Sequence, residues 1–233
     1  SSFRMRMDGR LENLQIEDST GRELRRTVID QDQLATLMQQ DLERVRAEQV
    51  AANFGKPVEV RDGDTKHKLQ VSGGNTAGLG VREVYTWRRS LLREEGFRLT
   101  AYEDAGGVAV GAGQNVTGQL KVGDQITVEQ ASVWFRDSSD AALNAGARIA
   151  RQYDVRDEGA VLALAGAAYQ LGEQGLRDFR KAGQAIADRD WVAFQREVRD
   201  SKWYQQTPAR VDRFIRAMRP HFRDFGSTPP AVG

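Results

Sequence analysis

The chain has 233 residues with 34 Lys and Arg, 33 Asp and Glu and no Cys, which gives a net charge of +1 at pH 7. The lack of cysteine excludes disulfides and thiolate metal sites, and the balanced charge argues against a protein that binds nucleic-acid phosphates. The two histidines, His67 and His221, are far apart, so we expect no metal site and no cofactor. No apolar run approaches the ~20 residues of a membrane helix, and no signal peptide is recognisable.

Residues 1–80 are predicted to form a small α+β unit of unknown role. Apolar alternation predicts one hairpin within residues 1–28 and a second hairpin over residues 56–72. Between them, apolar residues at helical spacing predict a helix over residues 30–54. Residues 72–80, SGGNTAGLG, have the composition of a flexible linker, so we place a domain boundary there.

The stretch Glu94–Gly113, EEGFRLTAYEDAGGVAVGAG, joins a helix end, a short strand pair and several carboxylates. Apolar residues recur at helical spacing from about Val81 and predict an amphipathic helix that ends before Gly96. In the strand pair, Gly106-Gly107 is predicted to be the hairpin turn and residues 108–110 the returning strand.

Two carboxyl groups in different surroundings are the arrangement that glycoside cleavage uses. A carboxyl at a helix C-terminus beside an apolar stripe should hold its proton, because burial and the negative helix end both disfavour the anion. A second carboxylate on a hydrated hairpin should stay ionised. Helical periodicity does not choose between Glu94 and Glu95 for the first of these groups.

The rest of the chain is predicted to be mainly helical. Residues 127–130, Thr-Val-Glu-Gln, fit a capping box that starts a helix. An Ala- and Gly-rich helix follows and should end near Gly172, and the last helix should begin at Thr207-Pro208 and stop before Pro220. Residues 223–233 are predicted to be a flexible tail. The residues that we expect in the core are Val84, Trp87, Leu91, Val161, Leu164, Phe179, Trp203 and Phe214.

Three separated blocks, in order, resemble one known family. EGFRLTAYED followed by GVAVGAG is similar to the opening of the phage-type lysozymes, the muramidases of glycoside hydrolase family 24, especially the T-even phage type. AAYQLGEQGLRDF (167–179) and SKWYQQTPARVDRFI (201–215) resemble the C-terminal lobe of that family. The resemblance covers about residues 81–222 and implies a two-lobed, lysozyme-like domain of the mainly helical α+β class.

The resemblance also implies a reaction and the residues that perform it. The substrate would be bacterial peptidoglycan, cut between N-acetylmuramic acid and N-acetylglucosamine. The matching positions favour Glu95 over Glu94 as the general acid, and Asp104 over Glu103 as the carboxylate that stabilises the oxocarbenium-like centre and orients or deprotonates water. Gln170 matches a glutamine of the cleft wall and is a candidate to hydrogen-bond sugar.

The chain departs from the family pattern at two positions beside the hairpin. Ala109 stands where the family has a threonine that helps to hold the attacking water, and Gln114 stands where it has a histidine that makes a structural ion pair. We count Ala109 and Gln114 with Gln170 as candidate substrate-binding positions. A second hypothesis follows from Ala109, namely a catalytically impaired lysozyme-like module that binds peptidoglycan or is structural in a virion.

The resemblance further implies a bacteriophage protein. The extra residues 1–80 favour a virion-associated lysin over a simple endolysin, and residues 1–80 are the candidate contact with other virion proteins. Such a lysin would act in the host periplasm and cell wall, whereas an endolysin would first accumulate in the host cytoplasm.

Overall fold

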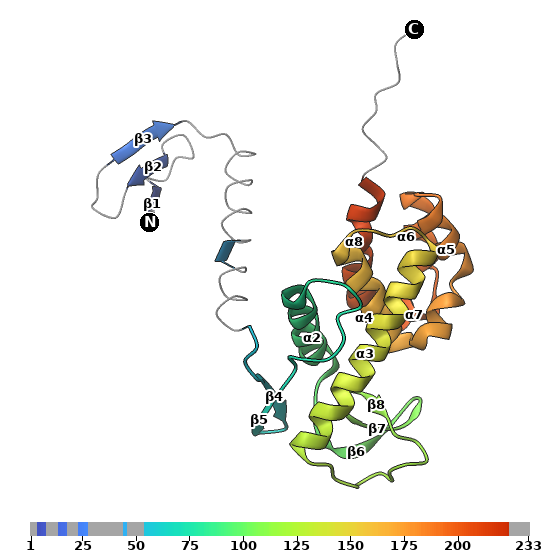
Figure 1. Ribbon diagram of the computed structural model, residues 1–233. Helices are drawn as coiled ribbons and strands as arrows, with labels where there is room; N and C mark the ends of the chain where they lie inside the picture. The colour runs from blue at the N-terminus through green and yellow to red at the C-terminus, as the bar shows by residue number, and fades with distance from the viewer. Residues whose placement is uncertain (1–3, 8–13, 18–22, 28–43, 46–53, 224–233) are drawn as a thin grey trace. The chain divides into compact units, whose positions relative to one another are not determined.

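The chain divides into two compact units between Phe54 and Gly55. The computed structural model (Figure 1) describes parts of the first unit and most of the second, namely residues 4–7, 14–17, 23–27, 44–45 and 54–223.

The first unit contains a three-stranded antiparallel sheet in the order β1 (Arg4–Met7), β2 (Leu14–Glu17), β3 (Glu23–Thr27). The pairing of β1 with β2 confirms the first predicted hairpin. Strand β3 was not predicted, because its sequence, ELRRT, lacks apolar alternation. Of the helix predicted over residues 30–54, residues 44–45 are described as helical and Phe54 lies in a turn. Residues 30–43 and 46–53 lie outside the described residues.

The second unit combines a hairpin, a small sheet and a group of helices, as expected for a mainly helical α+β fold. The hairpin is β4–β5, the sheet has the order β6-β7-β8, and all pairings are antiparallel. In chain order the elements are β4 (Val58–Asp62), β5 (Thr65–Leu69), α2 (Val81–Glu95), β6 (Arg98–Asp104), β7 (Gly107–Gly111), β8 (Gln114–Asn115), α3 (Val128–Gln152), α4 (Glu158–Arg177), α5 (Arg180–Ala187), α6 (Trp191–Arg199), α7 (Lys202–Gln206) and α8 (Pro208–Arg223).

Helix α3 connects the two lobes of this unit. It runs from the sheet β6-β7-β8 to the helices α4–α8 (Figure 1). The predicted capping box starts it: Thr127 Oγ1 accepts from Gln130 N at 3.1 Å, and Gln130 Oε1 accepts from Thr127 N at 2.9 Å. These bonds satisfy amide groups that the first helical turn leaves free. The two-lobed architecture predicted from the sequence is therefore confirmed.

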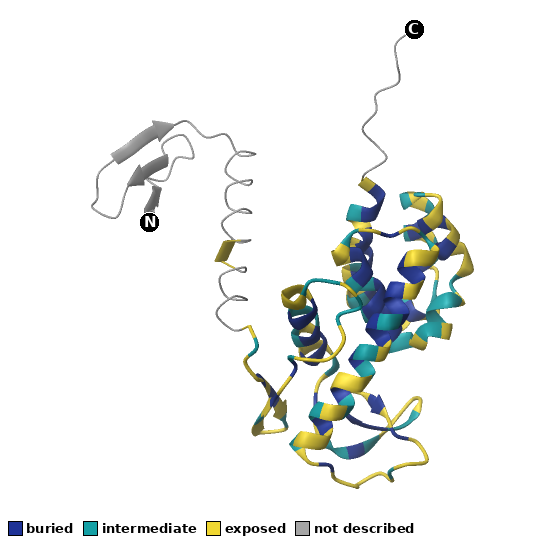
Figure 2. Ribbon diagram, in the orientation of Figure 1, coloured by how far each residue is buried: buried dark blue, intermediate teal, exposed yellow. Residues whose placement is uncertain are grey.

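The larger hydrophobic core lies in the helical lobe, where α4 meets α3, α5, α6 and α8 (Figure 2). A second core lies between the hairpin β4–β5, helix α2 and the sheet. Two of the predicted core residues, Trp87 and Phe179, are only half-buried. The other six are buried, as predicted: Val84, Leu91, Val161, Leu164, Trp203 and Phe214.

The structure places the domain boundary before the β4–β5 hairpin, not at residues 72–80. The hairpin itself is present as predicted, with Val58 opposite Leu69. Its apolar residues, however, share one core with Tyr85 of α2 and Phe135 of α3. The hairpin therefore belongs to the second unit, because an isolated hairpin cannot bury its apolar face.

Residues 72–80 are anchored to the second unit. The guanidinium of the buried Arg88 donates to the carbonyl oxygens of Gly73 at 2.7 Å and Asn75 at 3.0 Å. The same guanidinium contacts Ser139 Oγ at 3.0 Å and pairs with Asp140, both on α3. A Gly-rich segment therefore has a fixed path here, because a buried cation draws its carbonyl groups inward.

The helix end predicted near Gly172 coincides with a break: Gly172 is non-helical, with φ 70° and ψ 163°, and a second helical segment of α4 follows it and ends at Arg177. The end predicted for the last helix differs from the structure. Helix α8 continues through Pro220 to Arg223. A proline lacks an amide hydrogen and usually ends or kinks a helix, yet His221 and Phe222 beyond it are buried and hold the last turn in place.

The crossing of α3 and α4 depends on Gly146. A Cβ atom there would lie 2.5 Å from the backbone nitrogen of Ala165, so we expect Gly146→Ala to lower the free energy of unfolding by about 1–3 kcal/mol. The cost of the clash with Ala165 should exceed the ~1 kcal/mol by which alanine stabilises a helix relative to glycine. The control is Gly166→Ala in α4, where the nearest atom would lie at 3.6 Å. Urea unfolding measures both, and equal stabilities for the two variants would contradict the close crossing.

Candidate active site

The carboxyl group of Glu95 is surrounded by side chains from three helices. Glu95 is the last residue of α2, and its side chain is 15% exposed. Its Oε1 accepts from Arg210 Nη1 of α8 at 3.0 Å and from Gln170 Nε2 of α4 at 3.4 Å. Gln170 is fixed in turn by Trp203 of α7, whose Nε1 donates to Gln170 Oε1 at 2.9 Å. The acid is thus held in one position by contacts between distant parts of the chain.

Burial raises the pKa of Glu95 above its ordinary value, and the nearby charge of Glu94 acts in the same direction. Arg210 and Gln170 oppose this rise but do not cancel it. Because the folded state binds this proton more tightly than the unfolded chain does, the contribution of Glu95 to stability is lost as the pH rises through its folded pKa. The site therefore favours a protonated carboxyl that can donate its proton.

The neighbouring Glu94 has a different environment. Its side chain is 35% exposed and pairs with Arg213 Nε at 3.3 Å. Its backbone carbonyl accepts from Arg210 Nη2 at 2.9 Å, which satisfies an oxygen at the end of α2. The surroundings thus distinguish the two glutamates, which helical periodicity did not. Glu95 is the buried one of the pair.

Asp104 lies at the end of β6, directly before the hairpin turn. It is exposed, pairs in register with Gly107, and accepts a hydrogen bond from Ala105 N through Oδ1 at 2.8 Å. The charges of Asp104 and Glu95 both help burial to raise the pKa of Tyr102. The two carboxyl groups thus differ in their surroundings: that of Glu95 is half-buried, and that of Asp104 is exposed.

Ala109 and Gln114 lie on β7 and β8. Ala109 is 3% exposed, and its methyl group offers no polar atom. Gln114 is 7% exposed, and its carboxamide is used internally: Oε1 accepts from Ala112 N at 2.8 Å, and Nε2 donates to Tyr169 Oη at 2.6 Å. Gln114 therefore ties the sheet to α4.

Neither the role of Tyr169 nor the contacts of Trp203 are predicted from the sequence. Tyr169 Oη donates to Ala112 O at 2.8 Å, and burial raises the pKa of its hydroxyl far above the ordinary value. Both aromatic residues stand inside the blocks that resemble the family, at AAYQ and SKWY. The family resemblance was the signal available for them, because their partners are remote in sequence.

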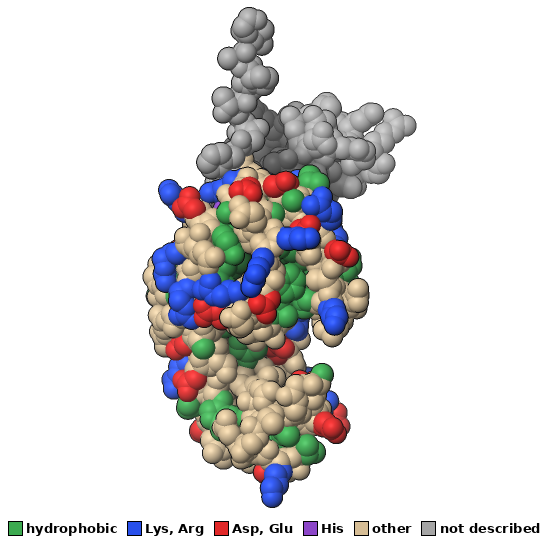
Figure 3. Space-filling model, turned by 90° about the vertical axis from the view of Figure 1, so that its right-hand side faces the viewer, with side chains coloured by type: hydrophobic (Ala, Val, Ile, Leu, Met, Phe, Trp, Pro, Cys, Tyr) green, Lys and Arg blue, Asp and Glu red, His purple; other side chains and the backbone are tan. Residues whose placement is uncertain are grey.

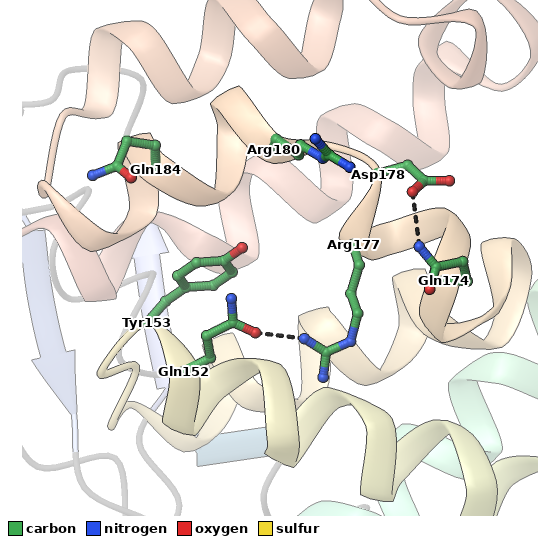
Figure 4. Close-up of a pocket in the computed structure, with 7 residues that line it drawn as sticks. All are labelled: Gln152, Tyr153, Gln174, Arg177, Asp178, Arg180 and Gln184. Atoms are coloured by element: carbon green, nitrogen blue, oxygen red, sulfur yellow. Dashed lines mark hydrogen bonds between the residues drawn. The ribbon is translucent and has the colours of Figure 1, made fainter.

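The surface of the second unit has hollows, and two of them differ in their linings. One has a volume of about 300 Å³, is largely apolar, and adjoins the acid's surroundings, with Glu94, Gln170 and Arg210 in its wall. The other, of about 350 Å³, is lined by side chains that carry polar or charged groups, and it lies between the ends of α3 and α4 and helix α5, where Arg177 contacts Gln152 and Gln174 contacts Asp178 (Figure 4). This second hollow shares no residue with the Glu95 cluster.

The face of the molecule in Figure 3 carries acidic and basic side chains intermixed, with no field of one sign. Within the described ranges, no three His, Cys, Asp or Glu side chains gather where they could hold a metal ion. No helix in the described part of the chain has the length and apolar character needed to cross a membrane.

A family model described as phage lysozyme matches residues 92–213, which include both carboxyl groups and the residues that hold Glu95. The chain belongs to the phage lysozyme family. The match ends within α8 and leaves out the first unit and the β4–β5 hairpin.

Three relatives illustrate the range of proteins to which this chain is similar. The peptidoglycan hydrolase gp36 of Pseudomonas phage phiKMV is 38% identical over 218 residues, which are 93% of this chain and 23% of the relative. The pre-baseplate central spike protein Gp5 of Enterobacteria phage T4 is 29% identical over 53% of this chain and 26% of the relative. Probable T4-type lysozyme 2 of Dictyostelium discoideum is 24% identical over 57% of this chain and 92% of the relative. The chain therefore spans about a quarter of the length of the two phage relatives.

The charge of Arg210 lowers the pKa of Glu95, so replacing Arg210 should change that pKa in a direction that can be measured. In Arg210→Gln the positive charge that lowers the pKa is gone, so we expect the pKa of Glu95 to rise further. Arg210→Lys keeps the charge and should leave the pKa nearer to that of the parent. ¹³C NMR titration of the carboxyl groups, with Glu95→Gln to assign the signal, measures all three. A lower pKa in Arg210→Gln than in the parent would contradict this electrostatic account.

Proposed function

We propose that the chain is a peptidoglycan-cleaving muramidase that hydrolyses the bond between N-acetylmuramic acid and N-acetylglucosamine. The observation that carries the proposal is the contrast between the two carboxyl groups. Glu95 is half-buried with a raised pKa, and Asp104 is exposed on the hairpin. Two carboxyl groups in such different surroundings are the arrangement that glycoside cleavage uses.

In the proposed reaction, Glu95 donates its proton to the glycosidic oxygen while the bond from that oxygen to the sugar C1 breaks. The Asp104 side chain stabilises the positive charge that develops at C1. A water oxygen then bonds to C1, and Asp104 accepts one of the water protons. Inversion at C1 requires the two carboxyl groups to lie about 6.5–9.5 Å apart, to leave room for this water.

The residues around Glu95 are proposed to act by orienting the acid. Arg210 and Gln170 both contact Oε1 of Glu95. Fixing that oxygen lowers the entropic cost of proton transfer, because the acid does not need to search for its rotamer. Gln170 also remains a candidate to bind sugar, whereas the carboxamide of Gln114 is already used between β8 and α4.

We further propose that this lysozyme is associated with a virion and acts on the host cell wall from the periplasm. Two observations support this. One relative is named as a central spike protein of phage T4. The match to the phage phiKMV hydrolase covers 93% of the chain and so reaches into the first unit. A part of residues 1–80 is then the candidate contact with other virion proteins, and an endolysin that gathers in the host cytoplasm is the alternative.

A specific observation favours a second candidate function, a module that binds peptidoglycan without cutting it. Position 109 carries a buried methyl group in place of a hydroxyl beside the hairpin. If no other group holds the attacking water, the fold would keep its affinity for the glycan and lose its turnover.

The muramidase proposal is tested with Glu95→Gln, which keeps the shape of the side chain and removes the proton donor. We expect the release of reducing ends from purified sacculi to fall by about 10²–10⁴-fold, because general acid catalysis typically contributes that much. Asp104→Asn should also reduce the release severely. Circular dichroism and sedimentation with sacculi show that each variant folds and binds.

Three outcomes separate the candidate functions. Release by the parent far above that of Glu95→Gln supports the hydrolase. Equal background release by both proteins, with both still bound to sacculi, would replace the hydrolase by the binding module. Anhydro ends in place of reducing ends, seen by mass spectrometry of the muropeptides, would indicate a lytic transglycosylase and overturn the hydrolytic step.

A further inference from the structure

The sheet β6-β7-β8 has two faces of opposite character. Val110 of β7 and Val116, which follows β8, belong to the buried core between the sheet, α2 and α3. On a strand, residues two apart share a face, so Asp104 and Tyr102 lie together on the other face. Their cross-strand partners are Gly107 and Ala109, and partners in register also share a face.

The same face continues beyond β7. Asn115 pairs with Ala109, and Thr117 follows two residues later, so it reaches the level of Gly107. A Cβ atom built at Gly107 would lie 2.1 Å from Thr117 Oγ1. The Thr117 hydroxyl therefore occupies the side of Gly107 on which a side chain would stand. Asp104, Gly107 and Thr117 form one row across the three chain segments, which we call the hydroxyl row.

The direction of the Thr117 hydroxyl is set by the backbone. Its oxygen accepts from Val108 N at 2.9 Å, which uses one lone pair and leaves the hydroxyl hydrogen available for another partner. Thr117 is exposed, as is Asp104 at the other end of the row. Because Gly107 has no side chain, the Thr117 hydroxyl fills the place beside it, and the hydroxyl stands next to the residue that pairs with Asp104.

Asn115 holds the row together. Its Nδ2 donates to Gly106 O of the hairpin turn at 3.0 Å, and its Oδ1 accepts from Thr117 N at 3.0 Å. One carboxamide thus links the turn that follows Asp104 to the backbone of Thr117. The two ends of the hydroxyl row keep their spacing through these bonds, and a fixed spacing is what a bound water needs.

We propose that Thr117 binds the attacking water of the hydrolysis beside Asp104, on the solvent side of the hydroxyl row. The water donates one hydrogen to the Asp104 carboxylate and accepts the hydroxyl hydrogen of Thr117. A lone pair of the water oxygen is then directed away from both residues, toward the sugar C1. This inference rests on the proposed muramidase function, and it assigns to Thr117 a hydroxyl that Ala109 cannot supply.

The test compares Thr117→Val, which removes the hydroxyl and keeps the shape, with Thr117→Ser, which keeps the hydroxyl. The control is Thr65→Val, in the exposed β4–β5 hairpin. Rates are measured on soluble glycan chains across a range of concentrations, together with the thermal midpoint of each protein. We expect Thr117→Val to lower kcat about tenfold with KM changed less than twofold, because one hydrogen bond to the water is lost in the transition state. Thr117→Ser should retain most of the parental kcat.

The outcomes separate this inference from the muramidase proposal. If the parent is far more active than Glu95→Gln but Thr117→Val keeps the parental kcat, the role of Thr117 is overturned and the muramidase stands. If Thr117→Val and Thr117→Ser lose the same activity, or if the loss follows the thermal midpoint and is shared by Thr65→Val, the hydroxyl is structural and the inference fails. If the parent equals Glu95→Gln, the muramidase proposal fails and this inference falls with it.

Discussion

The site depends on the partial burial of one carboxyl group, that of Glu95, under a single arginine. Burial alone would raise its pKa, and a close guanidinium alone would lower it; here the first effect is the larger. Arg210 also accounts for the position of the group, because it bonds both the carboxylate of Glu95 and the backbone carbonyl of Glu94. Side chains of α4 and α8 therefore contact the carboxyl group at the end of α2.

A second buried charge organises the junction of the lobes. Arg88 lies in the middle of α2 and satisfies its guanidinium with two carbonyl oxygens of residues 73–75 and two side chains of α3. Burial lowers the pKa of Arg88, while Asp140 opposes that change. A cation removed from water must find such partners, and here the partners are a Gly-rich segment and the helix that joins the lobes. The position of α2, and with it that of Glu95, is thereby fixed at the middle of the helix by Arg88 and at its end by Arg210.

The two faces of the sheet β6-β7-β8 have different surroundings. One face is apolar and packs on α2 and α3, and Gln114 and Tyr169 add a polar link to α4 at its edge. The other face carries the exposed Asp104 and the hydroxyl row. A short sheet with one buried face has its register fixed by that burial, so the polar face is held in register as well. The carboxylate of Asp104 is therefore exposed to solvent, while its position is fixed by the register of the sheet.

The sequence by itself determined the local elements, and in its family blocks it also indicated the two carboxyl groups. Apolar spacing predicted α2, the capping box predicted the start of α3, and apolar alternation over residues 56–72 predicted the β4–β5 hairpin, because each of these signals lies within a few residues. The tertiary structure alone decided that residues 72–80 are anchored, that Gln114 is used internally, and how far each glutamate is buried. Those outcomes depend on pairs such as Glu95 and Arg210, 115 residues apart. Burial and charge pairing depend on which residues lie close together in space, and local sequence patterns do not predict contacts between residues that are far apart in the chain.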